Sequence, residues 1–176
     1  FLLEIIENVR SKVGPDYPVG VRLSGSEYEP DGIEIEETIE VAKALEKAGV
    51  DVIHVSGGNH HTMDHQVVPM YLSLAHNVWA AAAIKKEVKI PVIASGSITT
   101  PELAEEILES GKADFVALGR PLFADPHFAN KAADGRPEDI APCIRCNEGC
   151  LARGVMPRGA VRCTVNVALG KEEEFK

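Results

Sequence analysis

Four cysteines near the C-terminal end of this 176-residue chain are the residues best suited to bind a metal. Cys143, Cys146, Cys150 and Cys163 follow the spacing C-x2-C-x3-C-x12-C, and residues 1–142 contain no cysteine. Thiolates are soft ligands, and four of them in a short glycine-containing loop can surround one metal centre. Disulfide scaffolds usually belong to small secreted domains with cysteines spread along the chain. The spacing therefore indicates an iron–sulfur cluster or a structural zinc site.

A second candidate site combines glycine with a polar donor at two consecutive predicted strand ends, Gly96-Ser97 and Gly119-Arg120. Glycine lets backbone N–H groups approach an anion closely, and an arginine supplies a planar charged fork. Each glycine taken singly is an ordinary loop residue. Their pairing at neighbouring strand ends favours a phosphate cradle. Arg22, on a strand surface of otherwise small residues, also needs an anionic or polar partner.

The third candidate is a polar loop that contains His60, His61, Asp64 and His65. These side chains could be metal ligands, acid–base groups or ordinary loop residues, and the pattern leaves the three interpretations open. Neighbouring histidines in a loop rarely present both rings to one ion. His54 lies in the middle of a predicted strand, where we expect a hydrogen-bonded core histidine.

The elements that position these residues alternate between strand and helix. Apolar residues at three-to-four spacing predict helices, and short apolar or alternating runs predict strands. Thr100 is the expected N-cap of the clearest helix, with Pro101 as its first residue and Gly111 as its stop signal. The predicted helices are 1–13, 35–48, 77–87, 101–110 and 125–133, and the predicted strands are 18–23, 51–55, 90–94 and 113–118.

Strands separated by helices of this length pair in parallel, so the predicted class is α/β. Either an open doubly wound sheet or a (β/α)8 barrel would satisfy this order. No G-x-G-x-x-G motif follows the first strand, which weakens the dinucleotide-binding open-sheet interpretation. The candidate site residues cluster at the C-terminal ends of strands, as expected for a barrel enzyme.

The composition excludes several classes of partner. The net charge of −9 and the pI of about 5.1 argue against nucleic acid or an anionic membrane, since both attract basic proteins. No apolar run approaches the roughly 20 residues of a membrane span, and no secretory leader opens the chain, so a cytoplasmic protein is expected. The chain starts at Phe1 inside a helical pattern and without Met, which indicates a fragment of a longer protein.

Six stretches resemble the old yellow enzyme superfamily of flavin oxidoreductases. The resemblance is to its iron–sulfur branch, which includes 2,4-dienoyl-CoA reductases, enoate reductases and bile-acid-type NADH:flavin oxidoreductases. The matching stretches cover nearly the whole chain in order: Phe1-Leu-Leu-Glu-Ile-Ile, Pro18-Val-Gly-Val-Arg-Leu-Ser24, His54-Val-Ser-Gly-Gly58, Ile90-Pro-Val-Ile-Ala-Ser-Gly96, Ala113-Asp-Phe-Val-Ala-Leu-Gly-Arg-Pro121 and Cys143-Ile-Arg-Cys-Asn-Glu-Gly-Cys150.

This resemblance implies a division of the chain into two parts. Residues 1–133 would form strands 5–8, the C-terminal half of a FMN-binding (β/α)8 TIM barrel. Residues 134–176 would form a linker and a short Cys-rich iron–sulfur segment. FMN would lie over the barrel mouth, with Arg22 at the flavin pyrimidine edge. The implied phosphate ligands are Gly96, Ser97, Gly119 and Arg120.

The resemblance also implies the chemistry. His61 matches a histidine that helps to deliver a proton to the substrate, although the adjacent His60 leaves the choice between the two open. The four cysteines would ligate a [4Fe-4S] cluster that passes single electrons to FMN. The expected reaction is the reduction of an activated C=C bond in a small unsaturated carbonyl substrate, with NAD(P)H as electron source.

Two other functions remain open at this point, an amine dehydrogenase on the same scaffold and a non-enzymatic zinc-stabilised α/β module. Family members continue past the last cysteine into a region that binds a second flavin, FAD, and a nicotinamide, whereas this chain stops at Lys176. We therefore expect the isolated 176 residues to be inactive. A homo-oligomer is possible, but nothing in the sequence specifies one.

Overall fold

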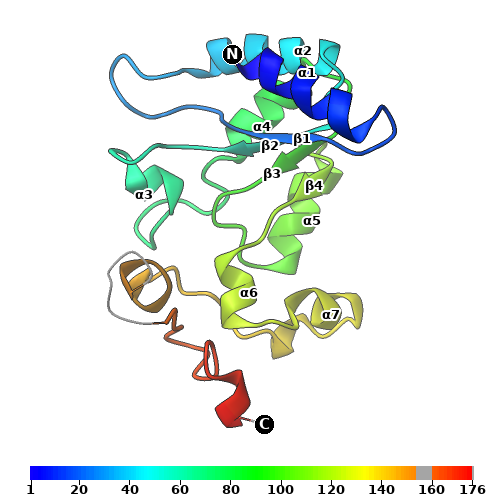
Figure 1. Cartoon of the computed structure of the whole chain (residues 1–176). Helices are drawn as coiled ribbons and strands as arrows, with labels where there is room; N and C mark the ends of the chain where they lie inside the picture. Colours follow the sequence, from blue (N-terminus) through cyan, green and yellow to red (C-terminus); the bar gives the residue numbers. More distant parts are fainter. Residues whose placement is uncertain (154–159, 176) are drawn as a thin grey trace.

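The predicted alternation of strands and helices is present in the computed structural model, which describes residues 1–153 and 160–175 (Figure 1). The strands are β1 (Gly20–Ser24), β2 (Val52–Ser56), β3 (Val92–Ala94) and β4 (Phe115–Val116). The α-helices are α1 (Leu2–Val13), α2 (Ile35–Lys47), α3 (Met63–Gln66), α4 (Val78–Lys85), α5 (Pro101–Glu109), α6 (Arg120–Ala124) and α7 (Phe128–Ala133).

The four strands form one parallel sheet in the order β1-β2-β3-β4, with Arg22 beside His54 and Ile93 beside Phe115 in the register. A doubly wound sheet reverses its strand order at a switch point, whereas a barrel keeps strands in chain order. Right-handed crossovers in a sequential sheet place the connecting helices on one face. The α/β prediction is confirmed, and the sequential order is that of part of a barrel.

The core lies between the sheet and these helices. Ile53, Val55 and Val92 point to the helix side and are fully buried, as are Leu45 of α2 and Ile84 of α4. Burial of such a side chain stabilises the fold by about 1.5–3 kcal/mol. Side chains alternate across a strand, so the other face of the sheet carries a different set of residues.

That second face carries Arg22, His54, Ile93 and Phe115. They are less buried than the helix-side residues, and Phe115 is 55% exposed. In a barrel this face points toward the interior. A charged side chain near the carboxyl end of a strand on this face is therefore close to the barrel mouth.

The differences from the predicted elements lie after β2 and β4. Helices α3 and α6 were not predicted, and the strand expected over 113–118 is reduced to Phe115–Val116. Gly119 is the N-cap of α6 and Pro121 lies in its first turn, which is a normal start for a helix. The last helix begins at Phe128 rather than Asp125, because Asp125 has extended backbone geometry.

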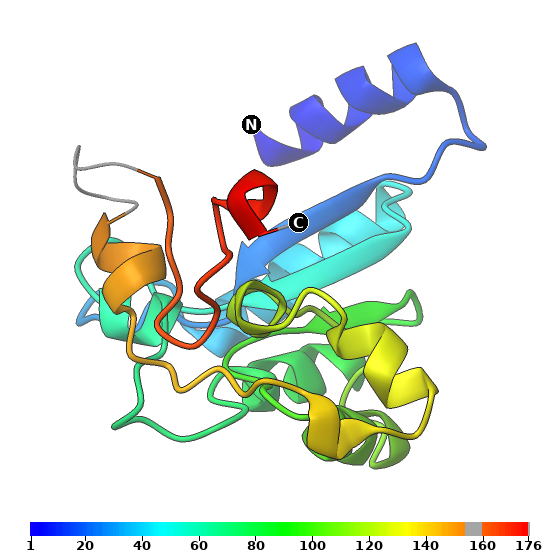
Figure 2. The ribbon, with the colours of Figure 1, turned by 90° about the horizontal axis from the view of Figure 1, so that it is seen from below.

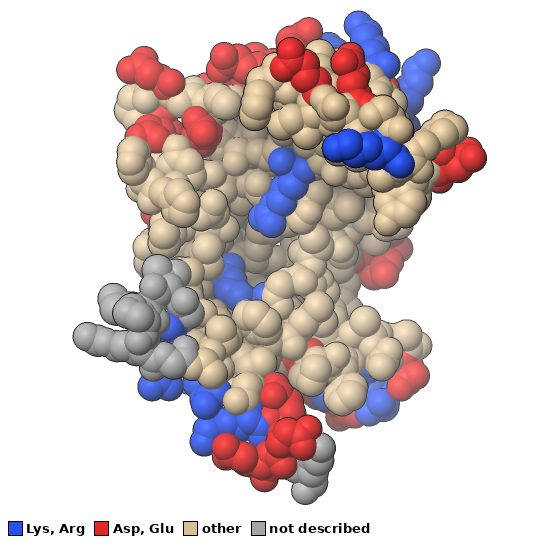
Figure 3. Space-filling view, viewed as in Figure 1, with Lys and Arg blue, Asp and Glu red and all other residues tan. Residues whose placement is uncertain are grey.

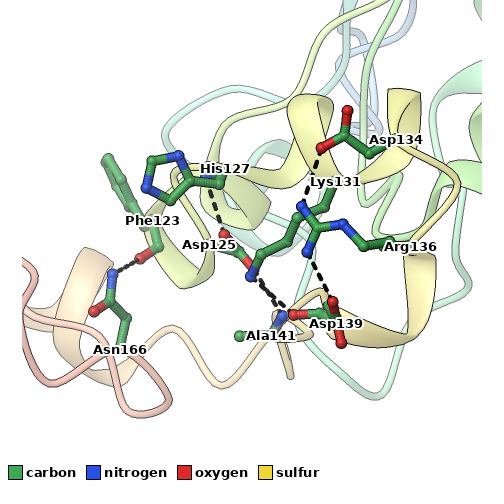
Figure 4. Close-up of polar contacts among 9 residues, drawn as sticks. All are labelled: Phe123, Asp125, His127, Lys131, Asp134, Arg136, Asp139, Ala141 and Asn166. Carbon is green, nitrogen blue, oxygen red and sulfur yellow. Dashed lines mark hydrogen bonds and ion pairs between the residues drawn. The ribbon is translucent and has the colours of Figure 1, made fainter.

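The side chain of Asp125 joins the last helix to the start of the cysteine-containing segment (Figure 4). It accepts hydrogen bonds from the backbone N–H of His127 at 2.9 Å and of Ala141 at 3.0 Å, and from Lys131 Nζ at 2.6 Å. Burial works to raise the pKa of Asp125, but the Lys131 charge and these donors outweigh it and lower the pKa. Asp125 therefore stays ionised and holds the chain that leads to Cys143.

In the cysteine segment, residues 143–163, the part that the structure describes contains a π-helical turn over Glu148–Ala152. Short 3-10 helices lie at Pro137–Asp139 and Glu172–Phe175. Figures 1 and 2 both place the segment next to α3 and the loop that follows it. Within the described residues, no helix combines the length and apolar character needed to cross a membrane.

Candidate functional site

A cavity of about 210 Å³ lies where the carboxyl ends of the strands meet. The five predicted cofactor-binding residues, Arg22, Gly96, Ser97, Gly119 and Arg120, all line it. The other lining residues are Ser56, Gln66, Val67, Asn77, Ser95, Ile98, Thr99, Ala117, Pro121, Cys143 and Arg145. Figure 3 shows a hollow on this face with Lys or Arg atoms at its centre and uncharged residues around them. The cavity is suited to an anionic or electron-rich ligand.

Arg22 enters this cavity from β1. Its guanidinium has no hydrogen bond to any residue that the structure describes, so its donors are available to a ligand. His54 neighbours it on β2, and burial followed by the charge of Arg22 lowers the pKa of His54. The prediction that His54 is a hydrogen-bonded core histidine is wrong in one respect. The Nε2 atom of His54 is buried without a hydrogen-bond partner among the described residues.

The turn Gly96-Ser97 is held by the segment before α4. Gly96 has φ +110°, and a Cβ there would lie 3.1 Å from both Cβ and N of Asn77. The Gly96 and Ser97 carbonyls accept from His76 N at 3.1 Å and Ala75 N at 3.3 Å. Within the described chain, the N–H groups of Gly96 and Ser97 have no partner. Two donors of this turn are therefore free at the cavity.

Gly119 differs from Gly96, because a Cβ built there would meet no atom within 4 Å. Its N–H also lacks a partner in the described part of the chain. An open glycine beside free donors can admit a phosphate group against the backbone. The residues at both strand ends therefore fit the anionic end of a nucleotide cofactor.

Arg120 is half-buried and already holds three protein groups. Its Nη1 donates to Val68 O at 2.8 Å and to Asn147 Oδ1 at 2.5 Å, and its Nη2 donates to Ser97 Oγ at 3.2 Å. Burial lowers the pKa of Arg120, an effect that the nearby cysteine sulfurs oppose. Arg120 thus contributes charge to the cavity while it connects the turn at Ser97 with the cysteine segment.

The predicted acid–base residue His61 does not line this cavity. Its side chain is 78% exposed, and its Nδ1 lies 2.8 Å from Glu29 Oε1. The hydrogen bond to Glu29 and the charge of that carboxylate raise the pKa of His61. No group of three or more His, Cys, Asp or Glu residues in the described chain is arranged to hold a metal ion, so the His60–His65 loop forms no such site there.

Asn77 is the main cavity residue that the sequence did not identify. It is 2% exposed, accepts from Tyr28 Oη at 2.8 Å and donates to the His65 carbonyl at 3.1 Å. The ring of Tyr28 stacks on that of His65 with centroids 4.1 Å apart, and His65 Nδ1 lies 2.8 Å from His76 Nε2. An asparagine before a helix normally indicates an N-cap, but here the side chain makes no capping bond. The local signal was therefore misleading.

All four cysteines line a second, smaller cavity. Arg120, Cys143 and Arg145 line both cavities, so the two candidate sites share a wall. Burial raises the pKa of the Cys150 thiol. Among the described residues, the four cysteines included, no group of three or more His, Cys, Asp or Glu side chains is arranged to hold a metal ion. A four-iron cluster binds each thiolate through a different iron, which suits cysteines arranged around a common cavity.

A comparison with protein-family models matches residues 1–139 to the family described as NADH:flavin oxidoreductase / NADH oxidase. An NADH oxidase of Thermoanaerobacter brockii is 45% identical over 172 residues, which are 98% of this chain and 26% of that protein. A cinnamate reductase of Clostridium sporogenes is 33% identical over 189 residues, covering 99% of this chain and 28% of that protein.

The solved structure of a 2-naphthoyl-CoA reductase in complex with 2-naphthoyl-CoA has a TM-score of 0.88 and 32% identity to this chain. The match covers 97% of this chain and 26% of that one. The chain therefore spans about a quarter of the length of these relatives, and the match extends through the cysteine segment.

Proposed function

Because the chain belongs to the NADH:flavin oxidoreductase / NADH oxidase family, we propose that it carries the FMN-phosphate and iron–sulfur sites of an ene-reductase. In this proposal residues 1–133 are strands 5–8 of an FMN-binding barrel. Residues 134–176 are the linker and the [4Fe-4S] segment. The remaining barrel strands and the FAD and NAD(P)H sites belong to the rest of a longer protein.

One observation carries the proposal: the five predicted cofactor-binding residues line one cavity, and that cavity shares a wall with the four cysteines. Cys143 and Arg120 both belong to this shared wall. A cluster at the cysteines would therefore lie next to a cofactor in the larger cavity. Adjacent redox groups are what single-electron delivery to a flavin requires.

Bound FMN would supply hydride transfer to the substrate. The chain's own residues would bind and orient it. The free N–H groups at Gly96, Ser97 and Gly119 would hold the phosphate, and Arg120 would supply positive charge beside it. Arg22, which has no hydrogen-bond partner among the described residues, would lie against the flavin pyrimidine edge and stabilise negative charge there.

His61 is the proposed proton donor. Its pKa is raised by Glu29, which keeps more of the imidazole protonated near neutral pH. His61 is exposed and does not line the larger cavity. Its role as proton donor is proposed from the family resemblance and from its raised pKa.

The four cysteines are the proposed ligands of the [4Fe-4S] cluster. Their arrangement around one cavity supports this assignment, because a four-iron cluster binds each thiolate through a different iron. Cationic side chains at Arg120 and Arg145 border the same cavity and would stabilise an anionic cluster.

The proposed substrate is a small unsaturated carbonyl compound, and the proposed electron source is NAD(P)H. Two of the relatives bear names of enzymes that reduce unsaturated acids or acyl-CoA compounds, the cinnamate reductase and the 2-naphthoyl-CoA reductase. Both are similar along nearly the whole of this chain. Their similarity supports C=C reduction, while an N,N-dimethylglycine/sarcosine dehydrogenase that is 32% identical over 98% of this chain keeps amine oxidation as the alternative.

The test begins with anaerobic purification of the full-length protein, followed by iron, sulfide, zinc and flavin analysis and a visible spectrum. We expect FMN, about four irons and four sulfides per cysteine segment, and NAD(P)H-dependent reduction of an enone or enoate. Arg22→Met should slow that reduction by roughly 10²-fold, as expected when a donor to developing charge is removed. Arg136→Met, an exposed change between Asp134 and Asp139, should leave the rate unchanged. A colourless, zinc-loaded protein would refute the proposal, and turnover of amines but not enones would refute the substrate class.

A further inference from the structure

A loop that lies against the cysteine segment depends on it for its hydrogen bonds. The wall loop, residues 66–73, contributes Gln66 and Val67 to the larger cavity. Arg145 donates to the carbonyls of Pro69 and Met70 at 3.2 Å, of Leu72 at 2.8 Å and of Ser73 at 3.3 Å. One guanidinium thus holds four carbonyl groups of a single loop.

Asn147 holds the beginning of the same loop. Its Nδ2 donates to Val67 O at 2.9 Å, while its Oδ1 accepts from Arg120 Nη1. Arg120 in turn donates to Val68 O. Across Val67–Ser73, every carbonyl except that of Tyr71 accepts a bond from Arg120, Arg145 or Asn147.

The wall loop has little internal support of its own. Only Leu72 N donates within it, to Pro69 O at 3.3 Å, and Val67 N donates back to Met63 at 2.7 Å. Loop backbone that is not paired internally needs outside partners to stay in one conformation. The cysteine segment supplies them from more than 70 residues away in the chain.

Arg145 and Asn147 are the two residues on either side of Cys146. Both have left-handed backbone geometry, with φ +56° and +60°. This geometry is unfavourable for an arginine, so the surrounding contacts must impose it. A turn of this kind points the two side chains toward the wall loop while Cys146 faces the cysteine cavity.

We propose that Arg145 and Asn147 are positioning residues through which the cysteine segment holds the wall loop in place as one side of the flavin cavity. This rests on the proposed function for the identity of the cofactor, but not for the contacts themselves. The cysteine segment would then have two roles, ligation of the cluster and support of the flavin pocket. Loss of the support would loosen the cavity wall without changing any of the five proposed cofactor-binding residues.

The test uses the full-length holoprotein and two conservative substitutions. Arg145→Lys keeps the charge but loses the planar fork that reaches four carbonyls, and Asn147→Asp keeps the acceptor for Arg120 but loses the donor to Val67. Hydrogen–deuterium exchange in peptides that cover 66–73 should rise roughly tenfold in each variant, and the dissociation constant of FMN, measured after reversible flavin removal, should rise by a similar factor. The iron content should stay unchanged, because neither substitution removes a proposed cluster ligand.

Two matched controls make the comparison specific. Arg153→Lys changes an exposed arginine of the same segment that has no hydrogen bond or ion pair with any residue that the structure describes. Asn166→Asp removes a comparable amide donor, 2.8 Å from the Phe123 carbonyl and away from the cavity. Neither control should change exchange in 66–73 or the affinity for FMN.

Unchanged exchange in the wall loop of both variants would overturn the proposal. Faster exchange spread evenly over the barrel would also overturn it, because Arg145 and Asn147 would then support the whole fold. Loss of iron in both variants would overturn it as well, because the two residues would then support the cysteine segment itself. A looser wall loop with unchanged FMN affinity would overturn the link to the cavity. A holoprotein without flavin would refute the proposed function, and the exchange rates would still decide whether Arg145 and Asn147 position the loop.

Discussion

The buried carboxylate of Asp125 allows the link between the barrel and the cysteine segment to be tested by a single substitution. In Asp125→Asn, Oδ1 can still accept from His127 N. The new amide nitrogen, however, replaces the oxygen that accepts from both Lys131 Nζ at 2.6 Å and Ala141 N at 3.0 Å. A donor would then face two donors at a site where Asp125 is 3% exposed.

The expected cost follows from the bonds lost. Hydrogen bonds to a charged group contribute roughly 1.5–3 kcal/mol each, and removal of one partner of a buried ion pair costs about 3–5 kcal/mol. Lys131 retains a bond to the Asp139 carbonyl at 2.8 Å and its side chain is 23% exposed, which reduces the penalty. We therefore expect Asp125→Asn to destabilise this region by about 3 kcal/mol.

The assay is hydrogen–deuterium exchange of peptides that cover Ala141 in the full-length protein. A loss of 3 kcal/mol corresponds to roughly 10²-fold faster exchange. Asp134→Asn is the matched control in the same cluster (Figure 4), because its ion pair with Arg136 is exposed and should be worth less than about 1 kcal/mol. Equal exchange in Asp125→Asn and Asp134→Asn would refute the reasoning.

The same substitution has a predicted pH dependence. The pKa of Asp125 is lowered in the folded protein, so its ionised form stabilises the fold above the unfolded-state pKa of about 4. That stabilisation is lost as the pH falls through the lower, folded-state pKa. The difference between the wild type and Asp125→Asn should therefore be complete at pH 7 and shrink below about pH 4.

Three further substitutions test the cavity and its surroundings. Gly96→Ala should lower the affinity for FMN roughly tenfold or more, because position 96 has φ +110° and a Cβ there would lie 3.1 Å from Asn77. Gly111→Ala is the control, because position 111 also has positive φ but open space around it, and it should leave the affinity unchanged. Flavin titration compares the two variants. Glu29→Gln removes the main cause of the raised His61 pKa, so the alkaline limb of the pH–rate profile should move to lower pH, and an unmoved limb would exclude His61 as the acid. The pKa of His54 is lowered by burial and by Arg22, so stability should fall as the pH drops below about 6.5, and urea titrations should show a smaller fall in His54→Gln.

Much of the fold could be read from the sequence, because its signals are local. The three-to-four spacing in residues 1–13 predicts the helix that the structure has at Leu2–Val13. Thr100 caps the helix that starts at Pro101, and its side chain accepts from Leu103 N at 3.3 Å. The expectation that polar residues at consecutive strand ends would meet is borne out by the cavity, because parallel strands bring their carboxyl ends to one edge.

The α/β class, the alternation of strands with helices, and the convergence of residues at the strand ends could thus be inferred from the sequence. The order of the strands in the sheet and the partners of the converging residues follow from the fold. No local sequence pattern indicates three of these contacts. They are the hydrogen bonds of Arg145 to carbonyls more than 70 residues away, the burial of Asn77 against Gly96, and the placement of His61 beside Glu29 outside the cavity. Such contacts depend on how distant segments pack, and periodicity and turn chemistry act only between near neighbours in the chain.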